Sequence, residues 1–452
     1  MLKGYNEYKD VELPWLKKIP AGWKLLRNKN VFEEKKELVG NRQKEFNLLS
    51  LTKKGIIIRD VSSGKGKFPK DFETYKVVQS GDIIFCFFDV DETPRTVGLS
   101  KYNGMITGAY NVFDICNVVP KYVLYYNIAI DNVKGYKPLY SGLRKVIPLQ
   151  AFFATKMPVP SKPEQDKIVQ FLDRKTSEMN CFIHQKKKQI KVLEELKRNI
   201  IDDLMTNGKN SEKQVKTSKA KWMGNVPYDW NEYRLKNLFQ EINVRSELGM
   251  EPHLSMSQKK GLVTDDEDIE RRLLSESYAG AKLCEKDDLV LNRLKAHLGV
   301  FALAPMKGIV SPDYTVLRIN SKRVIPKYLE YLLKSNACRR ELVTRVRGIV
   351  EGFWRLYTED LGEIPVCIPD IDEQKAILEV ILEKANHIDE MISAINKEIT
   401  LVEELRTKLI SDVVTGQVDV RDVKIPAYET KTDIINSEDD TDEENLNESM
   451  EE

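Results

Sequence analysis

The chain contains two copies of one segment, and this duplication constrains every fold it can adopt. A W-x4-P-x2-W-x3-R pattern begins at Trp15 and again at Trp222, 207 positions later. Far downstream, the Glu-Gln pair at 164–165 recurs at 373–374, 209 positions later. Because the offset changes by only two residues over this distance, one ancestral segment was duplicated whole, and such a period fixes the architecture.

Each copy consists of a head followed by a long helix. Residues 1–157 and 211–370 are rich in short apolar runs broken by Gly, Asn and Pro, which is typical of strands between turns. After a proline-marked exit, apolar residues at alternating steps of three and four run through 158–210 and 371–420, which indicates helices packed along one another. The sequence predicts an α+β protein in which two pseudo-twofold-related α/β heads are separated by a pair of long antiparallel coiled-coil helices. A plain helical bundle without a spacing role is the alternative.

The net charge of +1 conceals an uneven distribution of charged residues. Residues 1–157 hold 26 Lys and Arg against 16 Asp and Glu, whereas residues 421–452 hold 3 against 12. A basic body is typical of proteins that bind polyanions, although ordinary solvated lysines would give the same balance. The segment 421–452 has the composition of a disordered acidic tail. We expect a solubilising extension, with mimicry of nucleic acid as the alternative.

Motifs for catalysis, metal binding and secretion are missing. The six cysteines are scattered without a C-x-x-C pair, which predicts free thiols in a reducing compartment. The Gly- and Lys-rich run at 62–68 resembles a phosphate-binding loop only superficially, and we found no nuclease or methyltransferase signature. The N-terminus has no apolar signal core, and no run of about 18 apolar residues occurs. We therefore expect a cytoplasmic, non-catalytic chain that itself holds no metal or cofactor.

Recognition of nucleic acid requires hydrogen-bond donors and stackable rings on loops over a firm scaffold. Arg suits guanine edges, Asn suits adenine and Lys suits phosphate. For any single residue a plain surface role is the stronger interpretation, so only the whole set predicts an interface. The candidate DNA-binding residues are Arg59, Lys65, Lys67, Arg95, Lys101, Asn103, Tyr110 and Arg144 in the first head and Lys259, Lys260, Arg293, Lys295, His297, Tyr314 and Arg347 in the second. The tryptophans of the repeated opening pattern are expected to be packing anchors.

Together these motifs resemble the specificity subunit of type I restriction-modification systems, over about residues 15–421. The resemblance rests on the duplicated opening pattern, the proline-marked exits, Glu-Gln-x2-Ile, and a helix that contains L-E-E-L in one copy and V-E-E-L in the other. Two features depart from it. The first helix ends in M-T-N-G at 205–208 where the second has V-T-G-Q at 414–417, and the acidic tail follows residue 421.

The resemblance implies that each head is a target-recognition domain reading one half of a bipartite DNA sequence. The helices would set the gap between the halves and dock the modification subunits, and the chain itself would do no chemistry. The implied partners are double-stranded DNA, two modification (methyltransferase) subunits and, through them, restriction subunits, which bring S-adenosylmethionine, ATP and Mg. The implied partner-binding residues are Glu164, Gln165, Glu373 and Gln374. A non-catalytic two-headed scaffold for other proteins and a fragment of a larger enzyme are the alternatives.

Overall fold

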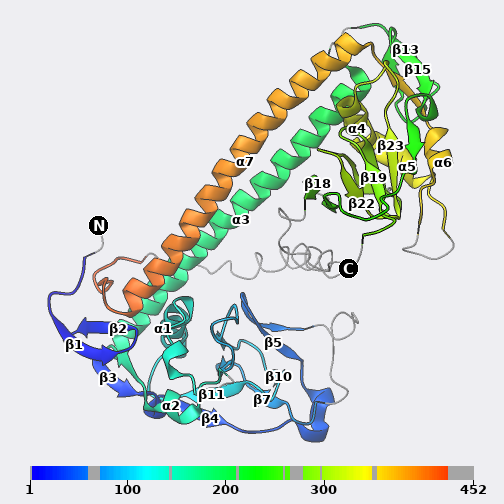
Figure 1. Ribbon diagram of the computed structural model, residues 1–452. Coiled ribbons are helices and arrows are strands. Elements are labelled where there is room, and N and C mark those ends of the chain that lie inside the picture. Colours follow the sequence, from blue (N-terminus) through cyan, green and yellow to red (C-terminus); the bar gives the residue numbers. More distant parts are fainter. Residues whose placement is uncertain are drawn as a thin grey trace. The chain divides into compact units, whose positions relative to one another are not determined.

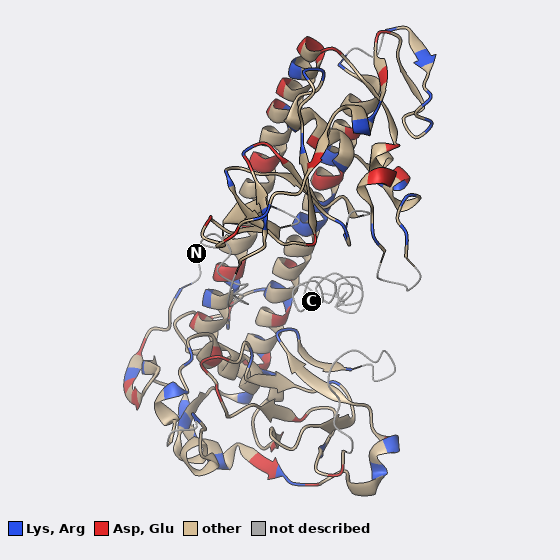
Figure 2. Ribbon diagram, turned by 45° about the vertical axis from the view of Figure 1, so that its right-hand side comes forward, with Lys and Arg blue, Asp and Glu red and all other residues tan. Residues whose placement is uncertain are grey.

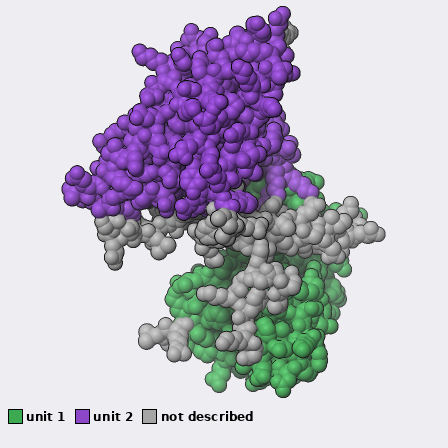
Figure 3. All heavy atoms as spheres, turned by 90° about the vertical axis from the view of Figure 1, so that its right-hand side faces the viewer, with its two compact units in different colours: residues 1–186, 397–452 green, residues 187–396 purple. Residues whose placement is uncertain are grey.

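The chain forms two compact units (Figure 3). The computed structural model describes residues 3–59, 72–141, 145–209, 213–257, 260–264, 278–295, 298–348 and 354–425, so the predicted acidic tail lies almost wholly outside them. Unit 1 comprises Met1–Lys186 and Lys397–Glu452, and unit 2 comprises Lys187–Asn396. The two long helices, α3 (Lys162–Asn207) and α7 (Ile371–Val414), each contribute residues to both units.

Unit 1 is built on a four-stranded antiparallel sheet in the order β4-β11-β8-β9 (Figure 1). Four antiparallel ribbons accompany it: β1-β2, β12-β3, β5-β6 and β10-β7. The strands are β1 (Tyr8–Leu13), β2 (Leu16–Pro20), β3 (Lys24–Arg27), β4 (Phe32–Lys35), β5 (Leu49–Thr52), β6 (Gly55–Ile58), β7 (Lys76–Val78), β8 (Ile83–Phe85), β9 (Val97–Leu99), β10 (Gly104–Ile106), β11 (Asn111–Ile115) and β12 (Lys156–Val159). The shorter helices are α1 (Pro120–Asn132) and α2 (Leu149–Ala154), with 3-10 turns η1 (Asn28–Asn30), η2 (Gly40–Glu45) and η3 (Lys137–Leu139).

Unit 2 repeats this topology strand for strand. Its sheet has the order β16-β23-β20-β21, and its ribbons are β13-β14, β15-β24, β17-β18 and β19-β22. The strands are β13 (Val215–Thr217), β14 (Asn225–Pro227), β15 (Asn231–Arg234), β16 (Gln240–Ile242), β17 (Leu254–Ser257), β18 (Gly261–Thr264), β19 (Lys282–Cys284), β20 (Leu289–Asn292), β21 (Phe301–Leu303), β22 (Gly308–Val310), β23 (Tyr314–Arg318) and β24 (Pro365–Ile368). The helices are α4 (Pro326–Lys334), α5 (Asn336–Val343) and α6 (Thr358–Gly362), with the 3-10 turn η4 (Leu235–Asn237). The predicted α+β class is confirmed, and the duplication extends to the strand pairing.

A glycine that recurs in both copies brings the segment before a hairpin against the ribbon β10-β7 in unit 1 and β19-β22 in unit 2. A Cβ at Gly104 would lie 2.4 Å from the carbonyl oxygen of Asn47, and one at Gly308 would lie 2.6 Å from that of Pro252. The residue after each glycine donates its N–H to the same carbonyl, at 2.8 and 2.9 Å. Only glycine permits this close approach of two backbones, which explains why it survives in both heads.

The repeated tryptophans are packing anchors, as predicted. Trp23 and Trp230 are 2% and 0% exposed. The indole N–H of Trp15 donates to the hydroxyl of Tyr126 at 2.9 Å, and that of Trp222 donates to a backbone carbonyl at 2.8 Å. Each opening pattern is thereby fixed to the body of its own unit.

Each long helix ends inside the core of the unit that contains its last turn. Val413 and Val414 of α7 lie in the unit 1 core, where Trp23 is also buried. Leu204 and Met205 of α3 lie in the unit 2 core. A glycine at positive φ follows in each case, at Gly208 (φ 72°) and Gly416 (φ 74°), which is how helices commonly terminate. The two helices therefore end in the same way, although their last residues differ in sequence (M-T-N-G at 205–208 and V-T-G-Q at 414–417).

The predicted helical seam is present in both α3 and α7. Along each helix, buried or half-buried residues recur at alternating steps of three and four, with exposed residues between them. The seam lysines reach across to the other helix. In unit 1 the ammonium of Lys186 lies 2.7 Å from Glu398, and in unit 2 that of Lys197 lies 2.7 Å from Asp389. Exposed ion pairs stabilise little, so we attribute stability to the apolar seam and assign the lysines to register.

The contacts between the helices follow the duplication. In unit 1, Arg406 donates to Asn180, while Lys186 lies beside Glu398, so residue numbers rise along α3 as they fall along α7. The helices are therefore antiparallel there. A shift of 209 positions carries Asn180 onto Asp389 and Lys197 onto Arg406, so the pair in unit 2 is the copy of the pair in unit 1. The duplication therefore extends to the contacts between the helices within each unit. Within the described residues, no helix is long and apolar enough to cross a membrane.

A buried glutamine fastens the start of α7 to its own head. Gln374 is 0% exposed. Its amide donates to the carbonyl oxygens of Arg323 and Pro369 at 2.8 and 2.9 Å, and its carbonyl accepts from the N–H of Ile325 at 2.9 Å. Ile325 directly precedes α4, so this one side chain ties two helix starts together.

Gln165 makes the equivalent contacts in unit 1. It is 2% exposed, donates to the carbonyl oxygen of Pro160 at 2.9 Å and accepts from the N–H of Val119 at 2.8 Å. Val119 precedes α1 as Ile325 precedes α4. The repeat of the Glu-Gln pair thus has a structural cause within each unit.

We predict that Gln374→Leu lowers the stability of unit 2. The substitution nearly keeps the volume but takes this partner from one N–H and two carbonyl oxygens, those of Ile325, Arg323 and Pro369. An unsatisfied buried group costs roughly 1–3 kcal/mol, so the free energy of unfolding should fall by about 3 kcal/mol or more. Urea denaturation measures this. Asp372→Ala, on the exposed first turn of α7, is the control and should lose less than about 1 kcal/mol. Equal losses in both variants would contradict the role assigned to Gln374.

Candidate nucleic-acid interface

A hairpin with a basic tip occurs at the same place in both units. In unit 1, exposed Lys53 and Lys54 join β5 to β6. In unit 2, β17 and β18 are joined through 258–260, where Lys260 is described and exposed. Each second strand opens on a glycine at positive φ, Gly55 (105°) or Gly261 (80°), so both turns need a residue without a side chain. Lys and Arg occur over both units (Figure 2), and the hairpins place some of them at equivalent tips.

A small second core supports each hairpin. In unit 1 it contains Leu49 and Ile56 of the hairpin, and in unit 2 it contains Leu254 and Leu262. Tyr110 packs against the first of these cores, stacked on Phe88 at 5.9 Å, and burial raises the pKa of its hydroxyl. Tyr314 packs against the second core. The structure therefore gives both predicted stacking tyrosines a role beneath the hairpins.

Several predicted contact residues are held by partners within their own unit. The guanidinium of Arg95 lies 3.3 Å from buried Asp131. Arg293 donates to the hydroxyl of Thr315 at 2.6 Å and lies 3.2 Å from Glu241. The remaining members of this group are Asn103, which accepts from the backbone N–H of Ser80 at 2.8 Å, and Arg347, which pairs with Asp360. Contact with DNA would require these side chains to exchange the bonds that they make here.

The remaining candidates divide into exposed residues and residues outside the description. The exposed ones are Arg59, Lys101, Lys260 and Lys295. Those outside the described residues are Lys65, Lys67, Arg144, Lys259 and His297. Sequence reasoning missed Lys53 and Lys54, although a signal existed. K-K-G follows L-S-L-T directly at 53–55, and K-K-G at 259–261 follows L-S-M-S after one additional residue, Gln258.

A second equivalent pair of lysines lies on β7 and β19. Lys76 donates to the carbonyl oxygen of Tyr110 at 2.7 Å, and burial lowers the pKa of its ammonium. Lys282 is 3% exposed. Burial lowers its pKa and the positive charge of Arg293 lowers it further, while Glu241, 3.9 Å away, opposes the shift. The corresponding ribbon strand of each unit thus carries a partly or fully buried lysine ammonium.

The predicted partner-binding residues are engaged inside their own units. Glu164 accepts from the hydroxyl of Tyr5 at 2.6 Å and from the indole N–H of Trp23 at 3.0 Å. Burial and this carboxylate raise the pKa of Tyr5. Glu373 instead lies 3.1 Å from the ammonium of Lys213. These carboxylates lie in the first turns of α3 and α7, beside the buried glutamines, and hold each helix start to its own unit. Binding of partners at the Glu-Gln pairs stays a prediction.

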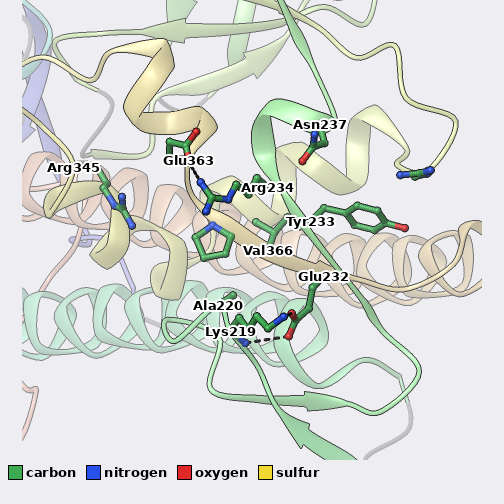
Figure 4. A pocket seen from close by; sticks show the side chains of 11 residues that line it. Lys219, Ala220, Glu232, Tyr233, Arg234, Asn237, Arg345, Glu363 and Val366 are labelled. Carbon is green, nitrogen blue, oxygen red and sulfur yellow. Dashed lines mark hydrogen bonds and ion pairs between the residues drawn. The ribbon is translucent and has the colours of Figure 1, made fainter.

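An open groove of about 890 Å³ lies on unit 2 beside β15 and β24 (Figure 4). Its lining includes Lys219 and Arg234, which pair with Glu232 and Glu363 respectively. The guanidinium of Arg323 lies 5.2 Å from the ring centre of Tyr233. Because carboxylates neutralise much of its positive charge, the groove is a poor site for a polyanion, and we leave it out of the interface.

The cysteines are unpaired with one another in the structure. All six cysteines, each within the described residues, are free thiols. Burial raises the pKa of Cys284 to about 11, with the charge of Asp288 adding to the effect, so this thiol is protonated at neutral pH. Among the residues that the structure describes, no group of three or more His, Cys, Asp and Glu is placed to hold a metal ion.

Comparison with known proteins agrees with the predicted resemblance. The type I restriction enzyme MjaVIII specificity subunit of Methanocaldococcus jannaschii is 25% identical over 284 residues, which cover 59% of this chain and 63% of that protein. A second protein of the same organism, provisionally named the MjaX specificity subunit, is 24% identical over 273 residues, which cover 59% of this chain and 60% of that protein. The matches thus span about three-fifths of the length of these relatives. No protein-family model matches the chain.

The fold has a counterpart among solved structures. A structure from work on complex assembly and conformational transition of the type I restriction-modification system has a TM-score of 0.61 and 14% identity, and the match covers 88% of this chain and 99% of that one. At this identity the likeness concerns the fold alone. With the named relatives, it confirms that the chain resembles type I specificity subunits in sequence and in fold.

We predict that Lys282→Met raises the free energy of unfolding at neutral pH. The lowered pKa means that the folded state disfavours the charged ammonium, so the wild type is penalised while Lys282 is charged. The penalty fades as the pH rises from the lowered pKa toward the ordinary lysine value of about 10.4. The advantage of the variant should therefore be largest near neutral pH and shrink in alkaline buffer, as measured by urea denaturation across pH. An advantage that grows with pH would contradict this assignment.

Proposed function

We propose that this chain is the sequence-specific DNA-recognition subunit of a type I restriction-modification complex. The observation that carries the proposal is the duplication of a whole head, with one strand order and one basic hairpin in both units. Two similar heads suit a target made of two half-sites. The named relatives support this function for the chain.

In this proposal each head reads one half of a bipartite DNA target. The lysines of the hairpin tips contact the phosphate backbone and set the position of the head. Neighbouring loops that differ between the heads supply base contacts, so the two half-sites differ in sequence. The candidates that remain exposed, Arg59, Lys101, Lys260 and Lys295, belong to this contact set.

The paired helices set the gap between the half-sites and dock the other subunits. The partners are double-stranded DNA, two modification subunits that bring S-adenosylmethionine, and restriction subunits that use ATP and Mg. The chain itself carries no reaction. A scaffold that binds only proteins is the competing function, and salt-dependent affinity for DNA separates the two.

We predict that Lys53→Glu with Lys54→Glu weakens DNA binding by the complex. The plot of log K against log salt has a negative slope, and each lost phosphate contact makes that slope shallower by about 1. The slope of the double variant should therefore be shallower than that of the wild type by about 2. Fluorescence anisotropy with a labelled duplex between low and moderate salt measures the slope. Lys17→Glu with Lys24→Glu, at two exposed lysines on β2 and β3, makes the same change in net charge and should leave the slope near that of the wild type. Equal losses in the two variants would remove the hairpin from the interface.

We also predict that lengthening both helices lengthens the gap. Insertion of one heptad after Ile200 in α3 and one after Ala385 in α7 preserves both seams. Seven residues add about 10 Å of helix, which corresponds to about three base pairs. Mapping of methylated adenine should show both half-sites unchanged and the gap longer by about three base pairs. An unchanged gap in a variant that still directs methylation would exclude the spacing role.

A further inference from the structure

The ribbons β12-β3 and β15-β24 are copies of one another, but the charges beside them are balanced differently. In unit 2, Arg234 at the end of β15 forms an ion pair with Glu363, which lies just before β24 (Figure 4). The ammonium of Lys236 in η4 lies 2.5 Å from the same carboxylate. One exposed carboxylate therefore serves two cations in this unit.

In unit 1 the cations are retained and the carboxylate is missing. Shifts of 207 and 209 positions give the corresponding residues as Arg27, Lys29 and Ala154, and all three are exposed. The same backbone hydrogen bond joins the two segments in both units, and in unit 1 it runs from the N–H of Asn28 to the carbonyl oxygen of Thr155 at 2.8 Å. A methyl group thus stands where unit 2 has its shared carboxylate.

A third cation lies beside these two in unit 1. Lys156 of β12 is exposed and is the cross-strand partner of Arg27, whereas its copy in unit 2 is Pro365. Like charges directly opposite one another destabilise a pair of strands. We define the basic patch as Arg27, Lys29 and Lys156. Within the described residues, none of these three side chains forms an ion pair or a hydrogen bond, so the patch is a site for an anionic group.

The acidic tail carries the opposite charge and is joined to this unit. Its part outside the described residues, 426–452, holds one Lys or Arg against eleven Asp and Glu, and six of the eleven lie in an acidic run at 438–444. Ile425, the last described residue, packs against the unit 1 core. Leu25 and Leu26 of β3 pack against the same core. The tail therefore leaves from the core that carries the patch.

The covalent connection favours contact between the acidic run and the patch. About 13 residues separate Ile425 from Glu438, and a chain of that length reaches at most roughly 45 Å. A short link of this kind gives an effective concentration on the order of millimolar. A single exposed ion pair stabilises little, but several carboxylates facing three clustered cations act as a network.

DNA is the rival anion for the patch, and comparison of the two copies argues against it. Under the proposed function both heads contact DNA in an equivalent way. The cations at the copied position of unit 2 are already paired with Glu363, so a phosphate contact at the patch would have no counterpart there. The missing carboxylate and the attached acidic run, by contrast, occur together in unit 1.

We propose that the acidic run 438–444 binds the basic patch of unit 1 in the same chain, where it takes the place of the carboxylate that Glu363 supplies in unit 2. The bound run shields this basic surface from nucleic acid, outside the hairpin interface. The inference is independent of the proposed function, because it concerns two parts of one chain.

Carbodiimide cross-linking of the full chain, followed by mass spectrometry, tests this contact, because the reagent joins an amine to a carboxylate only where the two touch. At low salt, Lys29 and Lys156 should cross-link to 438–444 with yields several-fold above that of Lys101, an exposed lysine of the same unit. An equal mixture of 15N-labelled and unlabelled chains should give cross-linked peptides of one label only. The yields should fall at high salt, which screens exposed charges.

The sharpest variant returns the missing carboxylate to unit 1. Ala154→Glu leaves both lysines in place and provides the partner that unit 2 has, so the yield of cross-links from the patch to 438–444 should fall by about threefold or more. Gln43→Glu makes the same change in charge at an exposed position of η2 and should leave the yield at that of the wild type. Circular dichroism melting of both variants should match the wild type.

Several results would overturn the proposal. One is a wild-type yield at Lys29 and Lys156 no higher than at Lys101. Another is a concentration of cross-links at Lys53, which would place the acidic run on the hairpin tip. A third is an unchanged yield in Ala154→Glu, and if that variant also weakens binding of a labelled duplex by the complex, the patch contacts DNA instead.

Discussion

The antiparallel packing of α3 against α7 is the interaction on which the rest of the structure depends. Each helix starts beside a buried glutamine that fastens it to one head, and each ends in a core of the other unit. The apolar seam supplies the contact along the helices, while Lys186 and Lys197 reach across at defined positions. Because the two helices are copies of one sequence, equivalent contacts hold the helix pair in unit 1 and in unit 2.

Comparison of the two copies shows which residues recur in both heads. Features that the fold needs in both copies were retained, such as the close-packed glycines and the buried glutamines. The hairpin tips kept their lysines although nothing in the cores requires them. The proposed contact residues at the hairpin tips therefore share with the packing residues the property of recurring in both copies.

The architecture could be predicted from sequence because it is carried by repeats and helical periodicity, which are visible in the order of residues. The strand order β4-β11-β8-β9 could not, because antiparallel pairing joins segments up to some 80 residues apart without a local signal. Individual site residues were the hardest features to predict from the sequence. Arg95 and Lys101 look alike in the sequence, yet only Arg95 faces a buried carboxylate, at Asp131. The sequence did not indicate that Gln165 and Gln374 are buried and make hydrogen bonds within their own units, and binding of partners at the Glu-Gln pairs stays a prediction.

The account makes one central claim, that two duplicated heads direct adenine methylation to a split DNA target. The most direct test is a genome-wide map of methylated adenine in the source cells, with and without this gene, under conditions in which the modification subunit is produced. The account predicts that one motif, made of two different half-sites and a fixed gap, loses methylation when the gene is removed. An unchanged map, with the modification subunit present and active, would contradict it.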